Sequence, residues 1–376
     1  MNTVNFALVG CGHIAAKHAQ AIARIRTARL LAVCDTHPGR TAPFREQYGA
    51  REYGDYQQLL HDPAIDVVSI CTPSGLHAQM AVDAARAGKH VVVEKPIALS
   101  LADADRIIKE CRQAKVKLAV VHPNRFIPAV QALKKALDEG RFGTLTHGNA
   151  TVRWNRNQAY FDRDAWRGTK DMDGGVHMNQ AVHNIDLLQW MLGPVAQVFA
   201  YTTTRLRKIE TEDLGVAALK FHSGALGVIE AASTLYPANL EETLAVFGET
   251  GTAVISGVTA SRLNTWHVAG YTEDEAASLK QAVNSAAAKP GHQVILEDMA
   301  ESVITGKEPL VNGAEGRKAL GIILAIYQSA ATGTPINLPF VQNCPNQAEP
   351  KSEPAPDCLS TLIPVKPYPA GRPRMK

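Results

Sequence analysis

Short, unbroken apolar runs alternate with helix-like segments over the first third of the chain. The runs cover residues 6–9, 30–34, 67–71, 90–93 and 118–121. Strands that are buried on both faces of a parallel sheet have this pattern. Between the runs, positions such as Ile14, His18, Ile22 and Ile25 recur every three or four residues, which is the spacing of one helix face. The alternation predicts an α/β domain with a doubly wound parallel sheet over residues 1–126.

The pattern changes after Phe126. Strand-like segments follow at residues 144–153, 195–204, 215–221 and 225–232. The last two are separated by three residues that include Gly224, which predicts a hairpin and an antiparallel sheet. A helix over residues 175–192, stopped by Gly193 and Pro194, is expected on one face of that sheet, with further helices near 291–305 and 314–332. Residues 127–340 are therefore predicted to form an α+β domain with a large open, mainly antiparallel sheet.

Composition narrows the classes of partner. The net charge of +3 over 376 residues, without a concentrated Lys/Arg run, disfavours nucleic acid. No segment reaches membrane-spanning length, no signal peptide is evident, and the six cysteines lack the close pairs of zinc or redox motifs, so we expect a cytoplasmic protein with reduced thiols. Residues 341–376 are rich in Pro, Lys, Glu and Ser and predict a flexible tail.

A glycine turn stands where the first predicted strand meets the first predicted helix. Gly10, Gly12, His13 and Ile14 belong to this turn, and its glycines allow a backbone to approach a pyrophosphate. About twenty residues later, Asp35 ends the second predicted strand, where a carboxylate binds the adenosine ribose hydroxyls. The pair predicts a bound dinucleotide, and the acid favours NAD over NADP because it would repel a 2′-phosphate.

Thr72 and Pro73 follow another predicted strand. Ligands of open α/β sheets bind at the carboxyl ends of the strands, so these residues are expected to border the cofactor. A plain proline turn explains the same spacing nearly as well.

Three motifs together resemble those of the Gfo/Idh/MocA family of glucose-fructose oxidoreductases and inositol dehydrogenases. Besides the glycine turn, they are Glu94-Lys95-Pro96, residues 72–77 and residues 179–183, and the likeness extends over about residues 6–339. The resemblance implies a Rossmann domain, a second domain whose open sheet often forms oligomer contacts, and hydride transfer between NAD(P) and a secondary alcohol of a sugar or cyclitol. It also implies a homodimer or homotetramer, and cofactor contacts from His77, Glu94 and Lys95.

Longer segments resemble one branch of the family, the UDP-N-acetyl-2-amino-2-deoxyglucuronate 3-dehydrogenases. These segments are residues 158–162, 165–169, 178–181 and 235–241. They imply oxidation at C3 of a UDP-N-acetylglucosaminuronate-like sugar, although sequence likeness predicts chemistry better than it predicts substrate.

Oxidation of an alcohol needs a base beside the nicotinamide, because the hydroxyl proton must leave with the hydride. Lys95 and His183 can each supply it. Asn179 precedes His183 by four residues, so both side chains are expected on one face of the helix predicted over 175–192. Family members often carry aspartate at the position of Asn179, and the change leaves the base open between Lys95 and His183.

Arginines and aromatic residues are candidates to line the sugar pocket, because arginine binds carboxylates or diphosphates and aromatic rings stack on sugars. They are Asn124, Arg125, Tyr160, Trp166 and Arg167. Asp171, Asp173 and His177 surround Gly174-Gly175 and are interpreted as a helix entry, so no metal is expected.

Three other functions remain open. One is a dehydrogenase or reductase of another sugar or of inositol, and one is a glycosidase that uses bound NAD for transient oxidation. The third is a non-catalytic dinucleotide-binding regulator, against which the presence of both Lys95 and His183 counts.

Overall fold

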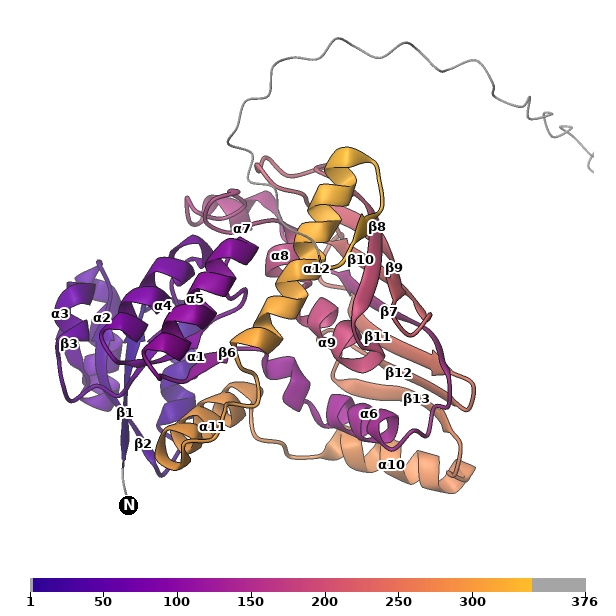
Figure 1. Ribbon diagram of the computed structural model, residues 1–376, viewed down its shortest axis with the longest axis horizontal. Coiled ribbons are helices and arrows are strands. Elements are labelled where there is room, and N and C mark those ends of the chain that lie inside the picture. Colours follow the sequence, from indigo (N-terminus) through magenta and orange to yellow (C-terminus); the bar gives the residue numbers. More distant parts are fainter. Residues whose placement is uncertain (1–2, 340–376) are drawn as a thin grey trace, which may run out of the picture. The chain divides into compact units, whose positions relative to one another are not determined.

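The computed structural model describes residues 3–339 (Figure 1). The tail predicted over residues 341–376 therefore lies outside the described residues. Within them, no helix is long and apolar enough to cross a membrane.

The first sheet has six parallel strands in the order β3-β2-β1-β4-β5-β6. They are β1 (Val4–Val9), β2 (Ala28–Cys34), β3 (Arg51–Tyr53), β4 (Val67–Ile70), β5 (His90–Val93) and β6 (Leu118–Val120). The doubly wound sheet is confirmed. The sequence prediction missed β3, because this three-residue edge strand is not an apolar run.

Helices alternate with these strands. They are α1 (His13–Ile22), α2 (Pro38–Tyr48), α3 (Tyr56–Leu60), α4 (His77–Arg86) and α5 (Leu101–Gln113), with short 3₁₀ turns η1 (Ser74–Leu76) and η2 (Pro123–Phe126). The strand order reverses between β1 and β4, and the crevice at such a switch point is where doubly wound sheets bind ligands. The turns after β1 and β4 therefore meet where a cofactor is expected.

The second sheet has eight strands in the order β13-β12-β11-β7-β10-β9-β8-β14. They are β7 (Leu145–Arg153), β8 (Val195–Thr203), β9 (Leu214–Phe221), β10 (Leu226–Ala232), β11 (Glu241–Gly248), β12 (Gly251–Ser256), β13 (Arg262–Val268) and β14 (Ile336–Asn337). Neighbours pair antiparallel except β7 with β10, and the predicted β9–β10 hairpin is confirmed by the pairing of Lys220 with Leu226. The mainly antiparallel sheet is thus confirmed.

Seven more helices complete the described chain. They are α6 (Pro128–Asp138), α7 (Gln158–Asp162), α8 (Val176–Asn179), α9 (Val182–Leu192), α10 (Glu273–Ser285), α11 (Gly291–Thr305) and α12 (Gly313–Thr332). Helix α9 packs on β7 and β11, and α12 packs on β8 as well as on α5 and β6. Helix α11 returns to α1 and β1, so the late part of the chain also supports the first sheet. The boundary at residue 126 stays a prediction.

The prediction of a single helix over residues 175–192 is wrong. The chain forms α8 and α9 with a break between them, because the N–H of Ala181 donates to the carbonyl of Val176, five residues back, at 2.8 Å. Such a wide turn shifts the helix register by one residue. Asn179 and His183 therefore belong to different helices and do not share one regular helix face.

Four cysteines of the described chain are buried and free, at positions 11, 34, 71 and 111, as the apolar surroundings predicted. Burial raises the pKa of Cys11 and of Cys111 to about 12. These two thiols are therefore protonated and unreactive near neutral pH.

Candidate active site

The turn after β1 has the shape that a diphosphate needs. Gly10 adopts φ +85°, and a Cβ at this position would lie 2.8 Å from the backbone nitrogen of Thr72. Only glycine fits there, which keeps the turns after β1 and β4 in close approach. Gly12 is the N-cap of α1 and makes no side-chain cap hydrogen bond, so the first N–H groups of the helix, including those of His13 and Ile14, are available to an anion.

Asp35 follows β2 and holds the same turn. Its Oδ2 accepts a hydrogen bond from the N–H of Cys11 and its Oδ1 accepts one from the N–H of His37, both at 2.8 Å. The side chain is partly exposed, so each oxygen keeps a lone pair for ribose hydroxyls. The fit to a dinucleotide thus rests on Gly10, Gly12 and Asp35 together.

Replacing Asp35 with alanine is expected to raise the KM for NAD about tenfold, because a charged hydrogen-bond acceptor is lost. It should also reduce the preference for NAD over NADP, because the charge that repels a 2′-phosphate is removed. Steady-state kinetics with both coenzymes measures the two effects. Asp35→Asn is the matched control, since it keeps an acceptor for the Cys11 N–H without the charge. An unchanged NAD/NADP ratio in both variants would reduce Asp35 to a support of the turn.

His77 has a structural role that the resemblance did not predict. The side chain is buried, and its Nδ1 and Nε2 lie 2.8 Å and 3.0 Å from the carbonyl oxygens of Pro96 and Thr72. Burial lowers its pKa, so the ring is neutral and donates to one of the two carbonyls. His77 thus links the segments after β4 and β5 and supports Thr72 and Pro96, while its contact with the cofactor stays a prediction.

Lys95 follows β5 and points to the break between α8 and α9. Its Nζ donates to the backbone oxygen of Asn179 at 2.9 Å and lies 3.4 Å from Asn179 Oδ1. Burial lowers the pKa of Lys95, and the charges of Arg156 and Arg167 lower it further. The lysine can therefore release and regain a proton more easily than an exposed lysine.

Asp173 holds the side chain of Asn179, the residue that Lys95 contacts. The sequence predicted only that Asp173 stands at the entry to a helix. Asn179 Nδ2 donates to Asp173 Oδ1, and Asp173 Oδ2 accepts from the N–H of Gly168 at 2.7 Å. Burial raises the pKa of Asp173, whose exposed fraction is 1%. The chain of contacts fixes the amide of Asn179 beside Lys95. The spacing of these residues in the sequence could not indicate this chain of contacts, because the contacts depend on the conformation of the loop between Gly168 and Asp173.

His183, near the start of α9, is a neutral, partly buried ring. Burial, with the charge of Lys95, places its pKa well below the ordinary value. Its Nδ1 has no hydrogen-bond partner within residues 3–339, and the ring centre lies 6.0 Å from that of His122. A buried polar atom without a partner costs free energy, so it suggests a position for a ligand group. A ring with so low a pKa is a weak base but can orient a hydroxyl.

Tyr160, in α7, lies among arginine side chains. Arg167 Nη1 donates to the Tyr160 hydroxyl at 2.7 Å, and the Arg167 guanidinium stacks on Trp166 at 4.5 Å. Arg156 lies 5.2 Å from the centre of the Tyr160 ring and 4.4 Å from that of Trp154. Tyr160, Trp166 and Arg167 thus gather as one cluster, to which the structure adds Arg156. Arg156 lies in a loop without a motif, so the sequence alone does not indicate it.

Arg156 carries a charge that its neighbours leave largely unbalanced. Its Nη1 donates to the Asn155 carbonyl at 2.7 Å and to Asn239 Oδ1 at 3.1 Å, both neutral groups. The carboxyl group of Glu242 also acts on it, but burial raises the pKa of Glu242 to about 7 and leaves its charge incomplete near neutral pH. Burial lowers the pKa of Arg156 itself. An anionic ligand would therefore be bound favourably here.

Arg125 is not part of this cluster. Its guanidinium donates to Asp186 at 2.6 and 2.7 Å and to Glu315 at 2.9 Å, and it is 3% exposed. These buried ion pairs connect η2 with α9 and α12. We correct its assignment from the sugar pocket to the interior. Asn124, one residue earlier, is partly exposed, and its pocket role stays a prediction.

The acidic residues at the entry to α8 do not converge with His177. His177 is buried and its Nδ1 lies 3.0 Å from Glu212 Oε1, whereas Asp173 is held by Gly168 and Asn179. Asp171 is exposed. The three side chains thus have separate surroundings.

The chain belongs to the Gfo/Idh/MocA family of NAD-dependent dehydrogenases of sugars and polyols. Residues 4–122 match the oxidoreductase family with the NAD-binding Rossmann fold, and residues 130–254 match the GFO/IDH/MocA C-terminal domain. NAD is its cofactor, and the turn at Gly10, the free N-terminus of α1 and Asp35 are the residues that would hold it.

Two solved structures are similar over nearly the whole chain. The WlbA dehydrogenase from Bordetella pertussis, in complex with NADH and UDP-GlcNAcA, is 39% identical with a TM-score of 0.86, covering 90% of this chain and 99% of that one. The WlbA dehydrogenase from Chromobacterium violaceum, in complex with the same two molecules, is 36% identical with a TM-score of 0.86, covering 91% and 98%.

More distant curated relatives act on other polyols and sugars. The myo-inositol 2-dehydrogenase of Thermotoga maritima is 28% identical over 83% of this chain and 92% of its own length. The D-apiose dehydrogenase of Rhizobium rhizogenes is also 28% identical, over 90% of this chain and 98% of its own length.

Proposed function

We propose that this enzyme oxidises the C3 hydroxyl of UDP-N-acetylglucosaminuronate (UDP-GlcNAcA) with NAD as the oxidant. The observation that carries the proposal is the half-buried Arg156, whose hydrogen-bond partners are neutral and whose charge, with that of Arg167, acts on Lys95. A uronic acid carries a carboxylate that such a site would bind, whereas inositol and apiose are uncharged. The similarity to two structures in complex with UDP-GlcNAcA supports the same substrate.

Lys95 is the proposed base. Its lowered pKa and its fixed contact with Asn179 place a proton acceptor at the end of β5. Bound NAD supplies the acceptor for the hydride that leaves the alcohol carbon. Lys95 removes the hydroxyl proton, Asn179 and Asp173 hold the lysine in position, and His183 accepts a hydrogen bond that orients the substrate. The pKa of His183 is too low for it to be an effective base near neutral pH.

Formation of NADH from a panel of alcohols tests the proposal. The purified enzyme is incubated with NAD and UDP-GlcNAcA, UDP-GlcNAc, myo-inositol or D-apiose. A parallel reaction contains a 2-oxoacid to recycle cofactor that stays bound, and there the 2-hydroxyacid formed is measured in place of NADH. We expect turnover of UDP-GlcNAcA and much slower turnover of the three compounds without a uronate carboxylate. Preferred turnover of myo-inositol or D-apiose would keep the family chemistry and replace the substrate. Binding of NAD without turnover of any alcohol would favour the regulator.

We also propose that the enzyme is a homo-oligomer assembled through the open face of the second sheet. Four large apolar side chains are exposed on neighbouring strands β8 to β10, namely Tyr201, Val216, Leu226 and Val228. An exposed apolar patch of this kind is typical of an interface. Sedimentation velocity should give a dimer or tetramer, and Val216→Asp with Val228→Asp should lower the mass. A wild-type monomer at micromolar concentration would exclude the proposal.

A further inference from the structure

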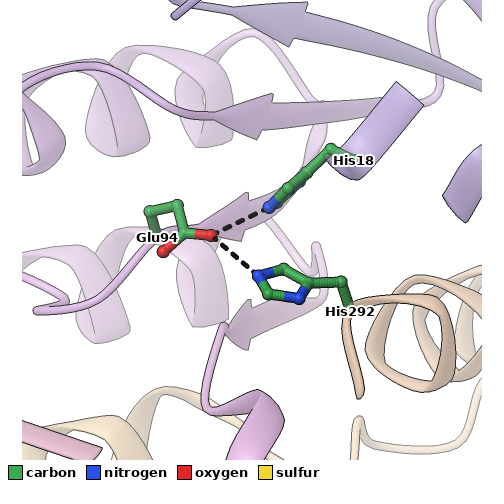
Figure 2. A group of neighbouring side chains, drawn as sticks. All are labelled: His18, Glu94 and His292. Atoms are coloured by element: carbon green, nitrogen blue, oxygen red, sulfur yellow. Dashed lines mark hydrogen bonds and ion pairs between the residues drawn. The ribbon is translucent and has the colours of Figure 1, made fainter. Parts of the chain in front are cut away.

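Glu94, the residue before Lys95, belongs to a polar cluster with His18 and His292. Figure 2 shows Glu94 between two histidines, with its Oε1 at 2.9 Å from His18 Nε2 and at 3.8 Å from His292 Nε2. The other oxygen, Oε2, accepts a hydrogen bond from the N–H of Lys95 at 3.2 Å. Glu94 is therefore hydrogen-bonded both to His18 and to the backbone of the proposed base, and burial, which lowers the pKa of His292 to about 4, leaves that second ring as a neutral neighbour.

The cluster brings together three segments that are distant in the sequence. His18 lies on α1, Glu94 follows β5, and His292 lies in the first turn of α11. The start of α11 is held against η2, because a Cβ at Gly291 would lie 2.2 Å from the carbonyl oxygen of Pro123. The helix that begins at the dinucleotide turn is thus linked to the lysine segment through one carboxylate.

Glu94 is held as a charged carboxylate. It is 6% exposed, and burying a charge without a partner is costly. Burial alone would raise its pKa, but the hydrogen bond and charge of His18 lower the pKa of Glu94 to about 2. His18 is itself fixed by Ser69, whose Oγ lies 2.9 Å from His18 Nδ1. Burial alone would lower the pKa of His18, but the neighbouring Cys71 and Glu94 raise it.

Neighbouring charges of both signs act on the pKa of Lys95. The titratable and charged groups that face Lys95 are Glu94, Asp173, Arg156, Arg167, His77, His122, His183 and His292. Those that face Glu94 are His18, His292, Lys95, His77, His122 and His183. The two carboxylates raise the pKa of Lys95, with Glu94 the larger of the two effects, and the two arginines lower it.

We propose that His18 holds the Glu94 carboxylate, with His292 packed beside it, as the fixed counter-charge of Lys95, so that Glu94 is the positioning residue that determines when Lys95 gains or loses its proton. The inference rests on the proposed role of Lys95 as base. Glu94 acts through Lys95 and need not touch the substrate.

The same three side chains could in principle bind a metal ion, because their donor atoms lie within 4.8 Å of one another. The 2.9 Å contact between His18 and Glu94 is instead a hydrogen bond with a proton between the atoms. The positive charges of Lys17 and Lys95 also act on His292 and disfavour a cation there. The geometry therefore favours a proton over a metal ion.

The test measures the proton equilibrium of Lys95 without any substrate. The full-length enzyme is treated with trace acetic anhydride at a series of pH values, and mass spectrometry gives the acetylation of the Lys95 peptide. In Glu94→Gln, the pKa of Lys95 should fall by about one unit, because a nearby opposite charge is removed. Glu94→Asp keeps the charge and should restore most of the wild-type value. Glu52→Gln, on the edge strand β3, is the matched control and should cause no shift.

His18→Gln is the second test if Glu94→Gln does not fold, as judged by its melting temperature. Without the cationic partner, Glu94 should take up a proton more easily, so the pKa of Lys95 should again fall. An unchanged Lys95 titration in folded Glu94→Gln or His18→Gln would overturn the inference. So would a stoichiometric metal ion in the purified enzyme whose removal by EDTA shifts the titration. Full activity of Lys95→Met would instead contradict the proposed base, whatever the labelling shows.

Discussion

Replacing Lys95 with methionine is expected to lower kcat by about 10³-fold, within the range of general acid–base catalysis. Methionine has a similar length and fits a buried site, but it cannot take a proton. The contact of Nζ with Asn179 is also lost. NADH binding should change little, because Gly10 and Asp35, which would hold the dinucleotide, follow β1 and β2, whereas Lys95 follows β5. Stopped-flow NADH formation gives kcat, and fluorescence titration with NADH gives binding.

Lys109→Met is the control for the lysine substitution. This residue is exposed on α5 in the same part of the chain, and its replacement should leave kcat within about twofold of wild type, as is usual for surface changes. If Lys95→Met kept more than a tenth of wild-type kcat, the base would have to be assigned elsewhere, with His183 the first alternative.

Replacing Arg156 with glutamine is expected to raise the KM for UDP-GlcNAcA by about 30- to 100-fold and to change kcat much less. Losing one partner of a buried charge pair costs about 2 kcal/mol or more, which corresponds to this range. The effect should be absent for UDP-GlcNAc, which has no uronate carboxylate. Initial-rate kinetics with the two sugars separates the loss of carboxylate binding from a general defect.

Arg163→Gln is the matched control for Arg156. Arg163 also lies near the Tyr160 ring, at 5.6 Å, but it is exposed and pairs with Asp164 at 3.3 Å. Its replacement should change the KM by less than about threefold, as expected of an exposed ion pair. Equal KM changes in both variants, or equal losses with both sugars, would exclude a specific carboxylate contact at Arg156.

The apolar pattern sufficed for most of the first sheet, because central parallel strands are buried on both faces and must be apolar throughout. It failed for β3, where an edge position tolerates Arg51 and Glu52. It also failed at the break between α8 and α9. The pattern of buried residues there suits one continuous helix, and only the hydrogen bond from Ala181 to Val176 shows the extra residue.

For the site, motifs identified residues whose position follows from a strand end. Gly10 and Asp35 come directly after strands of the first sheet and Lys95 comes two residues after one, so their place relative to one another is a consequence of the topology. Asp173 and Arg156 could not be found in this way, because loops bring them to Lys95. Arg125 was misassigned because a guanidinium that can bind a substrate carboxylate can equally pair with a buried carboxylate of the chain, here Asp186.

The fate of the C3 hydrogen tests the central claim most directly. UDP-GlcNAcA that carries deuterium at C3 is incubated with NAD and the full-length enzyme, and the nicotinamide is examined by NMR and mass spectrometry. The proposed function predicts one deuterium at C4 of the reduced nicotinamide, with loss of the label from the sugar. Reduced nicotinamide without deuterium, or sugar that keeps its label while NADH accumulates, would contradict oxidation at C3.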